Sequence, residues 1–222
     1  MKIAICLPSH SLSHARFTHC LAAMVAFTLK ARPELVLETI SVQGTLPRVR
    51  NCLFRDALAA RADYSLWLDN DHVFPESALI RLLSLNLPVV GINQPTRSLT
   101  PVPTARNAAG ERIYTTPEQA AARNIEAVRH MGFGICLIDM KIVGKLQDNA
   151  KARKRASIFP LFSQMMTPDP DQVVGEDSFF CDLMAELGIP LHIDHWLSWE
   201  TKHLATVPIS MADALEKRPA PR

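Results

Sequence analysis

The sequence lacks any apolar run long enough to cross a membrane. Its first apolar stretch ends at Pro8, which is too short for the core of a signal peptide. The later stretch 21–27 falls far below the roughly 20 residues of a transmembrane helix. A large excess of one charge is also missing, since the net charge is +2, and this argues against a surface that coats nucleic acid. We therefore expect a cytoplasmic protein whose contact with a membrane, if it has one, is peripheral.

Two further absences concern cysteine and glycine. The five cysteines form no CxxC pair and no zinc-ribbon spacing, which favours reduced, buried thiols over disulfides or a zinc site. No glycine occurs from position 8 to 13, where a nucleotidyltransferase usually carries a glycine-rich phosphate loop after its first strand. This gap disfavours a nucleotidyltransferase, which stays an alternative.

What the sequence does contain is an alternation of strand-like and helix-like segments, with a composition that is 48% hydrophobic over 222 residues. That length suits one domain with its own core. The patterns predict strands at 3–7, 35–42, 64–68, 88–92, 135–138 and 190–193, and helices at 13–30, 48–60, from Pro75, 141–146 and 177–187. The alternation predicts an α/β fold whose open, mostly parallel sheet is flanked by helices. Ligands of such sheets bind at the carboxyl ends of the strands.

The strongest chemical signal follows the strand at 64–68. Asp69, Asn70 and Asp71 come directly after it, so two carboxylates stand one residue apart at the end of a buried strand. Their mutual repulsion disfavours burial, whereas a divalent cation favours it, because Mg²⁺ and Mn²⁺ prefer carboxylate oxygens and share their remaining positions with phosphates. A solvated turn at the strand end is the alternative interpretation.

Two later segments carry further candidates. Glu176 and Asp177 lie at the start of a predicted helix, where a carboxylate can act as a general base or can simply stabilise the helix terminus, with Asp177 or Ser178 as the cap. His203 is a candidate third ligand for a cation held by the two aspartates. The cluster His192, Asp194 and His195 reads as structural, because residues 192 and 194 share one face of a strand and residue 195 points away.

In this order and spacing, these segments resemble the GT-A glycosyltransferases, especially small proteins like those of glycosyltransferase family 2. The resemblance covers roughly residues 1 to 207. Asp69-Asn70-Asp71 matches the DxD motif of that family, Glu176-Asp177 resembles its acidic pair, and His203 stands where a late metal-binding histidine is found. In two places the chain departs from the family pattern: an acidic residue is missing after the first strand, and Leu204 follows the histidine where glycine is common.

The resemblance implies a GT-A fold and a metal-dependent, hexosyltransferase-like activity. The enzyme would move a sugar from a UDP- or GDP-sugar to a hydroxyl of a glycan or other acceptor. Inversion of configuration is the expected outcome, and retention stays an alternative. Mn²⁺ or Mg²⁺ would be the cofactor, held by Asp69, Asp71 and His203, and Asp177 with Glu176 would supply the base. The implied substrate-binding residues are Pro8, Ser9, Arg48, Arg50, Asn51, Asn70, Arg97, Gly132, Phe133 and Gly134.

The domain organisation expected from this resemblance is a single catalytic domain, 1–210. Its nucleotide-binding half would be 1–95, its acceptor-side half 96–210, and 211–222 would form a flexible tail. Residues 96–117 read as a long loop or hairpin and 151–155 as a basic loop. A catalytically inactive module of the same fold, binding a glycan or a protein partner, remains a second alternative.

Overall fold

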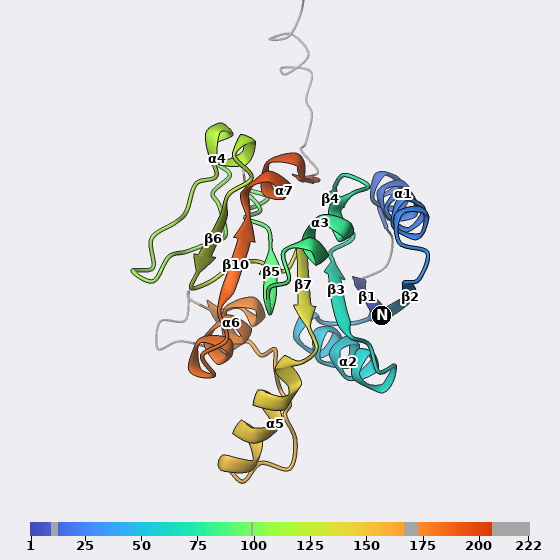
Figure 1. The fold of residues 1–222 in the computed structure, drawn as a ribbon. Coiled ribbons are helices and arrows are strands. Elements are labelled where there is room, and N and C mark those ends of the chain that lie inside the picture. The colour runs from blue at the N-terminus through green and yellow to red at the C-terminus, as the bar shows by residue number, and fades with distance from the viewer. Residues whose placement is uncertain (10–12, 99, 167–172, 206–222) are drawn as a thin grey trace, which may run out of the picture.

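The computed structural model describes residues 1–9, 13–98, 100–166 and 173–205. His10 and the expected tail 211–222 lie outside the described residues. The chain folds around a seven-stranded sheet with the order β2-β1-β3-β7-β5-β10-β6 (Figure 1). Its strands are β1 Lys2–Ser9, β2 Val36–Gln43, β3 Tyr64–Leu68, β5 Val89–Gly91, β6 Ile125–Val128, β7 Ile135–Asp139 and β10 Leu191–Asp194.

The sheet is mixed. Strands β1, β2 and β3 are parallel to one another, and so are β5 and β10. Strand β7 runs antiparallel between β3 and β5, and β6 closes the far edge antiparallel to β10. All five strands of the two parallel groups therefore end at the same edge as Asp69, while the antiparallel β7 begins there, directly after the segment Gly132–Gly134.

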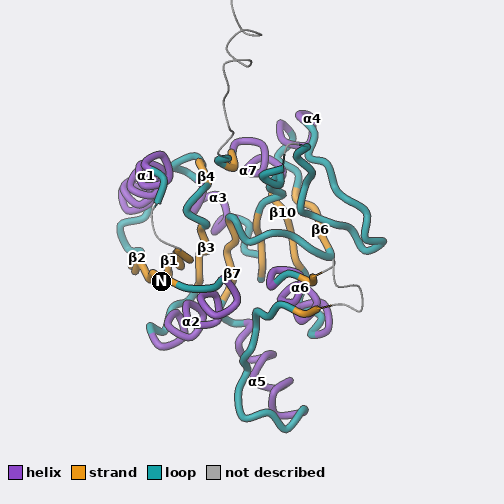
Figure 2. The backbone as a smooth tube through the Cα atoms, turned by 180° about the vertical axis from the view of Figure 1, so that it is seen from behind, coloured by secondary structure: helices purple, strands orange, loops and turns teal. Residues whose placement is uncertain are grey.

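Helices cover both faces of this sheet, as the alternation of the strands requires. On one face, the odd-numbered Ile3 and Ile5 pack with α1 Ala15–Ala31 and α3 Ala78–Ser84. On the other, Ala4, Cys6 and Trp67 pack with α2 Leu46–Ala59, α5 Ile142–Ala152 and α6 Glu176–Glu186. Side chains of a strand alternate between faces, so the buried residues of β1 and β3 contribute to two separate cores. Figure 2 shows the helices on either side of the strands.

Most of the predicted elements are confirmed, with boundaries that differ by a few residues. Two details were wrong. Pro75 precedes its helix, because residues 75–77 form a turn in which the Ala78 amide bonds the Pro75 carbonyl at 3.0 Å. Helix α5 continues to Ala152, so the expected basic loop 151–155 begins inside a helix whose exposed face carries its lysines.

The second half of the chain contains short elements that the patterns did not reveal. These are β4 His72–Val73, α4 Pro117–Ala121, β8 Met165–Met166, β9 Val173–Val174, α7 His195–Glu200 and β11 Lys202–His203. Strand β11 pairs with β4, so that His203 lies opposite His72. None of the described helices combines the length and the apolar character that crossing a bilayer requires.

Candidate active site

The candidate site lies where β3 and β1 end. Strand β3 stops at Leu68, and the Asp69 amide bonds the Gly134 carbonyl at 2.9 Å, which attaches the DxD segment to the segment that leads into β7. Strand β1 continues three residues beyond its last partner on β3, the Cys6–Trp67 pair. Pro8 and Ser9 therefore reach the same edge of the sheet as Asp69, as the predicted substrate-binding role requires.

A buried arginine joins the predicted acids from two distant segments. Arg50 of α2 is 1% exposed, and its guanidinium lies 3.4 Å from carboxylate oxygens of Asp69, Glu176 and Asp177. It also stacks over the Phe133 ring at 5.2 Å. Arg50 is thus enclosed by the site's own residues, and its predicted substrate contact would have to act through the carboxylates that it holds.

Three carboxylates around one guanidinium leave an excess of negative charge. Burial raises the pKa of Asp177 to about 7, and the neighbouring Glu176 and Asp69 add to this effect while Arg50 opposes it. Asp177 Oδ2 accepts a hydrogen bond from the Phe133 amide at 3.2 Å. The N-cap residue of α6 is Gly175, which has no side chain to bond the first amides of the helix, so neither Asp177 nor Ser178 is the cap. The first-turn position therefore leaves the Asp177 carboxylate free to face the Phe133 amide and Arg50.

A second cluster forms around Asp71. His203 Nε2 lies 3.4 Å and Arg97 Nη1 2.8 Å from Asp71 Oδ2, and His72 Nδ1 lies 2.9 Å from Asp71 Oδ1. The two histidine rings stack with their centroids 4.3 Å apart. Although burial alone would raise the pKa of Asp71, the imidazoles of His203 and His72 beside it lower it below its usual range. Asp71 is therefore held as a carboxylate beside two imidazoles.

The hydrogen bond of His203 to Pro95 fixes which ring nitrogen faces Asp71. Nδ1 lies 2.8 Å from the Pro95 carbonyl oxygen, which can only accept, so Nδ1 carries the proton. When the ring is neutral, Nε2 presents a lone pair towards the Asp71 carboxylate, and when the ring is protonated, Nε2 donates to it. Two lone pairs that face each other need a proton or a metal ion between them, and outer hydrogen bonds of this kind orient metal-binding histidines.

Within the described part of the chain, several buried polar atoms of the site lack a hydrogen-bond partner of acceptable geometry. They are Asp69 Oδ1, Asp71 Oδ1, both ring nitrogens of His72, Gln94 Oε1, Thr104 Oγ1, Asp177 Oδ1 and Arg50 Nη1. Buried polar groups are nearly always paired, and an ion or ligand is one common reason for an exception. Ligand atoms of Asp71, His72 and His203 all lie within 4.8 Å of one another. This cluster therefore has the donor set and the unpaired atoms of a divalent-cation site.

Asp69 and Asp71 face different partners despite their adjacency in the motif. Asp69 contacts Arg50, while Asp71 contacts the two histidines and Arg97. The histidine next to the motif, His72, did not enter the prediction, although an aspartate followed by a histidine was visible in the sequence. Gln94 was also missed, and nothing in its local pattern marks it as part of a site.

The remaining predicted substrate residues fall into different surroundings. Arg48 is exposed, and its guanidinium lies 3.4 Å from the Gln43 carbonyl. Asn51 uses its amide group to hold the backbone of residues 161 and 162 and the Pro47 carbonyl. Asn70 is half-buried between the two motif aspartates. The roles of these three residues in substrate binding stay predictions.

The Gly132–Gly134 segment packs closely against the Asp71 cluster. A Cβ atom at Gly134 would overlap Gln94 Oε1 and lie 2.5 Å from His72 Nε2, and one at Gly132 would lie 2.9 Å from Gln94 Nε2. Only glycine leaves space for these side chains. The two glycines therefore leave room for the side chains of Gln94 and His72. The ring of Phe133, between the glycines, packs against the Arg50 guanidinium.

The HxDH cluster is structural, as its pattern indicated. Asp194 caps α7 through the amides of Trp196 and Leu197 and bonds Arg81 Nε at 2.6 Å. His195 lies between Thr115 and Glu126, at 2.9 and 3.0 Å. Asp194 and His195 are thus used within the fold.

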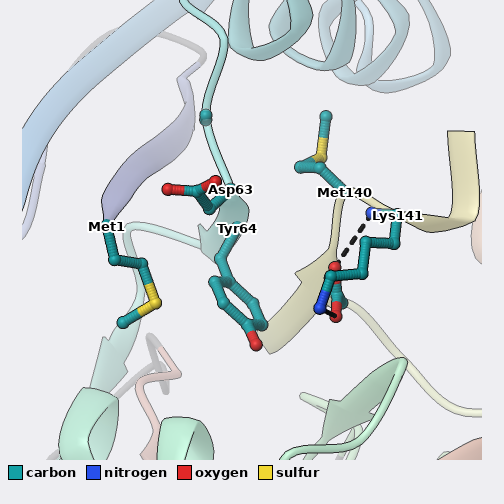
Figure 3. A pocket seen from close by; sticks show the side chains of 7 residues that line it. Met1, Asp63, Tyr64, Met140 and Lys141 are labelled. Atoms are coloured by element: carbon teal, nitrogen blue, oxygen red, sulfur yellow. Dashed lines mark hydrogen bonds and ion pairs between the residues drawn. The ribbon is translucent and has the colours of Figure 1, made fainter.

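A separate hollow of about 420 Å³ lies at the opposite edge of the sheet, where β1 and β3 begin. Met1, Tyr64 and Lys141 surround it (Figure 3). Asp63 accepts from the Lys2 amide at 2.7 Å, and Asp139 from the Lys141 amide at 2.9 Å. Its acids are thus already paired, and it lacks the unsatisfied groups of the site at the carboxyl edge.

Comparison with known proteins gives a likeness of fold. No protein-family model and no curated protein matches the sequence. A crystal structure of GalNAc-T7 with UDP, GalNAc and Mn²⁺ matches with a TM-score of 0.52 and 10% identity, over 91% of this chain and 43% of that chain. The chain thus spans less than half the length of that relative.

Two further structures match with lower scores. A197 from STIV matches with a TM-score of 0.48 and 13% identity, over 95% of this chain and 97% of that one. The structure of S. aureus TarS 1-349 in complex with UDP-GlcNAc matches with a TM-score of 0.46 and 14% identity, over 95% and 59%. The seven-stranded mixed sheet, its helices on both faces and the likeness to GalNAc-T7 together show that the chain has the fold of the GT-A glycosyltransferases.

Proposed function

We propose that the chain transfers a sugar from a nucleoside diphosphate sugar to a hydroxyl acceptor, with a divalent cation held by Asp71, His203 and His72. The observation that carries this proposal is the group of ligand atoms of Asp71, His72 and His203 within 4.8 Å of one another at the carboxyl edge of a GT-A sheet. Asp71 Oδ1 and both ring nitrogens of His72 have no hydrogen-bond partner among the described residues. The Asp71 carboxylate suits Mn²⁺, and the neighbour GalNAc-T7 was crystallised with that ion. Asp69 stays a predicted further ligand.

A cation bound there would act as a Lewis acid on the diphosphate leaving group. The protein's own contribution begins with orientation, because the Pro95 carbonyl directs His203 Nε2 inward and the buried His72 ring stacks behind it. Arg97 is the exposed cationic partner of this cluster: its side chain is 57% exposed while it pairs with Asp71. In the loaded site it would be able to turn from Asp71 towards phosphate oxygens, which guanidinium groups bind well.

Asp177 is the proposed base, and Glu176 its neighbour within the acidic pair. Its pKa of about 7 is close to the value at which a general base is most effective near neutral pH. Arg50 and the Phe133 amide fix the direction of its carboxylate. Direct removal of the acceptor proton by this group implies inversion at the anomeric carbon.

The decisive experiment is a thermal-shift and hydrolysis panel of UDP, GDP and their sugars, with and without Mn²⁺. A ligand at a hundredfold excess over its Kd adds about 2.7 kcal/mol to stability, which is roughly 5 to 11 °C for a domain of this size. We expect a shift that needs both nucleotide and Mn²⁺, and slow release of nucleoside diphosphate. A Mn²⁺-dependent shift without any release would instead support an inactive binding module, and no shift with any nucleotide would refute the proposal.

Two variants separate the proposed roles. Asp71→Asn should lose metal-dependent nucleotide binding while the fold is retained. Asp177→Asn should bind nucleotide nearly normally and fail to transfer sugar. Unchanged turnover in the first would remove the metal mechanism, and normal transfer in the second would remove the base.

A further inference from the structure

A group of basic residues lies on three paired segments beside the acidic pair. Arg106 forms isolated antiparallel bridges with Arg112 on one side and with His130 on the other. The Arg106 amide bonds the His130 carbonyl at 2.9 Å, and the Ile113 amide bonds the Ala105 carbonyl at 3.0 Å. The loop between β5 and α4 thus runs alongside the chain that leads from β6 (Figure 1).

This pairing puts like charges directly opposite each other. Residues opposite one another in antiparallel pairs project to the same face, with their Cβ atoms about 4.5–5.5 Å apart, and like charges there are destabilising. Among the described residues, the guanidinium groups of Arg106 and Arg112 bond only a backbone carbonyl each, of Gly110 at 2.7 Å and Pro103 at 2.5 Å. No carboxylate of the described residues forms an ion pair with either guanidinium. The two arginines therefore keep a repulsion that an anion would relieve.

The basic side chains share a cavity with the proposed base. A cavity of about 260 Å³ is lined by Arg106, Arg112 and His130 on one side and by Glu176, Asp177 and Ser178 on the other. Thr104 also lines it, and its buried hydroxyl oxygen has no hydrogen-bond partner among the described residues. His130 already has an acidic partner, since its Nε2 lies 3.0 Å from a carboxylate oxygen of Asp182. The positive charges in this cavity that have no acidic partner among the described residues are therefore those of Arg106 and Arg112.

The two sides of the cavity differ in their charge balance. Glu176 and Asp177 turn towards Arg50, which lies 3.4 Å from both, so their charge is partly compensated from within the protein. The arginines have no such compensation from the described acids. A ligand that fills the cavity would place a hydroxyl near Asp177 and a negative group near Arg106 and Arg112.

From this geometry we propose that the acceptor carries an anionic group, a phosphate or a carboxylate, which Arg106 and Arg112 bind while its hydroxyl faces Asp177. The inference rests on the proposed function and specifies its acceptor class. Arginine is suited to this task because its planar group binds phosphate or carboxylate through two parallel hydrogen bonds. The Thr104 hydroxyl is available as a further donor to the same group.

The experiment titrates the protein with glucose 6-phosphate, glucuronate and glucose by NMR. We expect both anionic probes, or one of them, to bind more tightly than glucose. A preference for glucose 6-phosphate identifies phosphate as the anion, and a preference for glucuronate identifies carboxylate. In the double variant Arg106→Gln with Arg112→Gln, the Kd of the anionic probe should rise by at least about tenfold, because two charge-assisted hydrogen bonds are lost.

Two control variants make the result specific. Arg106→Lys with Arg112→Lys keeps the charge and should retain most of the affinity. Arg16→Gln with Lys30→Gln removes two exposed charges from α1 and should leave the binding unchanged. The proposal is overturned if anionic probes bind no better than glucose, or if the two glutamine double variants bind them equally well.

Failure of this inference and failure of the proposed function give different results. Mn²⁺-dependent binding of UDP or GDP reports on the Asp71 cluster, and the anionic sugars report on the cavity beside Asp177. Normal nucleotide binding without an arginine-dependent anion site overturns the acceptor class alone. An arginine-dependent anion site without nucleotide binding overturns the glycosyltransferase proposal, on which the acceptor role depends.

Discussion

Arg50 Nε lies 3.4 Å from Oδ1 of Asp177, and this contact joins α2 to the first turn of α6 across the base of the site. The same guanidinium reaches Asp69 at the end of β3. Three segments that are far apart in the sequence thus meet on one buried cation. Because the surrounding carboxylates outweigh the cost of its burial, the pKa of Arg50 is raised above its usual value.

Replacement of Arg50 should be among the most destabilising changes in the site. Arg50→Met leaves three carboxylates without their cation, and removing one partner of a buried charge cluster costs about 3–5 kcal/mol. Denaturant unfolding at pH 7 measures the loss. At lower pH the carboxylates take up protons, so the deficit should shrink.

Arg48→Met is the matched control for this prediction. Arg48 lies on the same helix but is exposed, so its replacement should change the free energy of unfolding by about 0.5 kcal/mol or less. Equal losses in the two variants would show that helix α2, not the charge cluster, is what the substitution disturbs.

The pKa of Asp177 predicts opposite effects of pH on activity and on stability. As the proposed base, Asp177 must be ionised, so the rate of transfer should rise with pH through about 7. Its pKa in the folded chain lies above the ordinary 3.8, so between about pH 4 and 7 the folded state holds a proton that the unfolded state has lost. The contribution of this group to stability therefore falls as pH rises across that window.

Asp177→Asn tests both halves of this expectation. The asparagine does not titrate, so the melting temperature of the variant relative to the parent protein should increase from pH 5 to pH 8. Its transfer activity should be lost at every pH. A difference in melting temperature that stays constant with pH would show that burial does not raise the pKa of this carboxyl.

The cation site can be tested by binding alone. His203→Ala removes one of three ligand atoms of the Asp71 cluster, and we expect the Kd for Mn²⁺, measured by electron paramagnetic resonance of the free ion, to rise by more than about tenfold. His19→Ala removes an exposed histidine from α1 and should leave the affinity unchanged. Equal Mn²⁺ affinities in the two variants would show that His203 is not a ligand of the ion.

Much of the fold could be predicted because its central strands, β3, β5 and β7, are buried on both sides. Strands such as β3 and β7 read as continuous apolar runs with sharp ends, and the helices of the first half show a clear apolar face. The direction of β7 could not be predicted, because a run like Ile135–Asp139 looks the same in a parallel or an antiparallel strand. The two-residue strands β4 and β11 are too short to carry any periodicity.

The sequence could mark the acidic residues of the candidate site, but it marked fewer of the other polar residues. Asp71 and His203 stand out by their chemistry and their position after apolar segments, and the structure brings them within 3.4 Å. Arg50 was predicted to contact substrate, whereas its burial at the centre of the acids follows only from how α2 packs on the sheet. Gln94 and the basic pair at 106 and 112 depend on loop pairing, which no local pattern encodes.

Gly134 provides a test of the cation site in which no proposed ligand is substituted. A Cβ atom there would overlap Gln94 Oε1 and lie 2.5 Å from His72 Nε2. His72 is completely buried, and the Gly134 carbonyl holds the Asp69 amide, so neither the ring nor the backbone has free space to move into. Gly134→Ala should therefore displace His72 and cost about 1–3 kcal/mol of stability, as overpacking does.

Gly144→Ala is the matched control, because nothing lies within 4 Å of a Cβ at this exposed position of α5. Alanine in place of a helical glycine should stabilise the fold by up to about 1 kcal/mol. Mn²⁺ affinity should fall in the Gly134 variant and stay unchanged in the Gly144 variant. If Mn²⁺ binds the Gly134 variant with its original affinity, the ring of His72 contributes nothing to the cation site, and Asp71 with His203 must hold the ion without it.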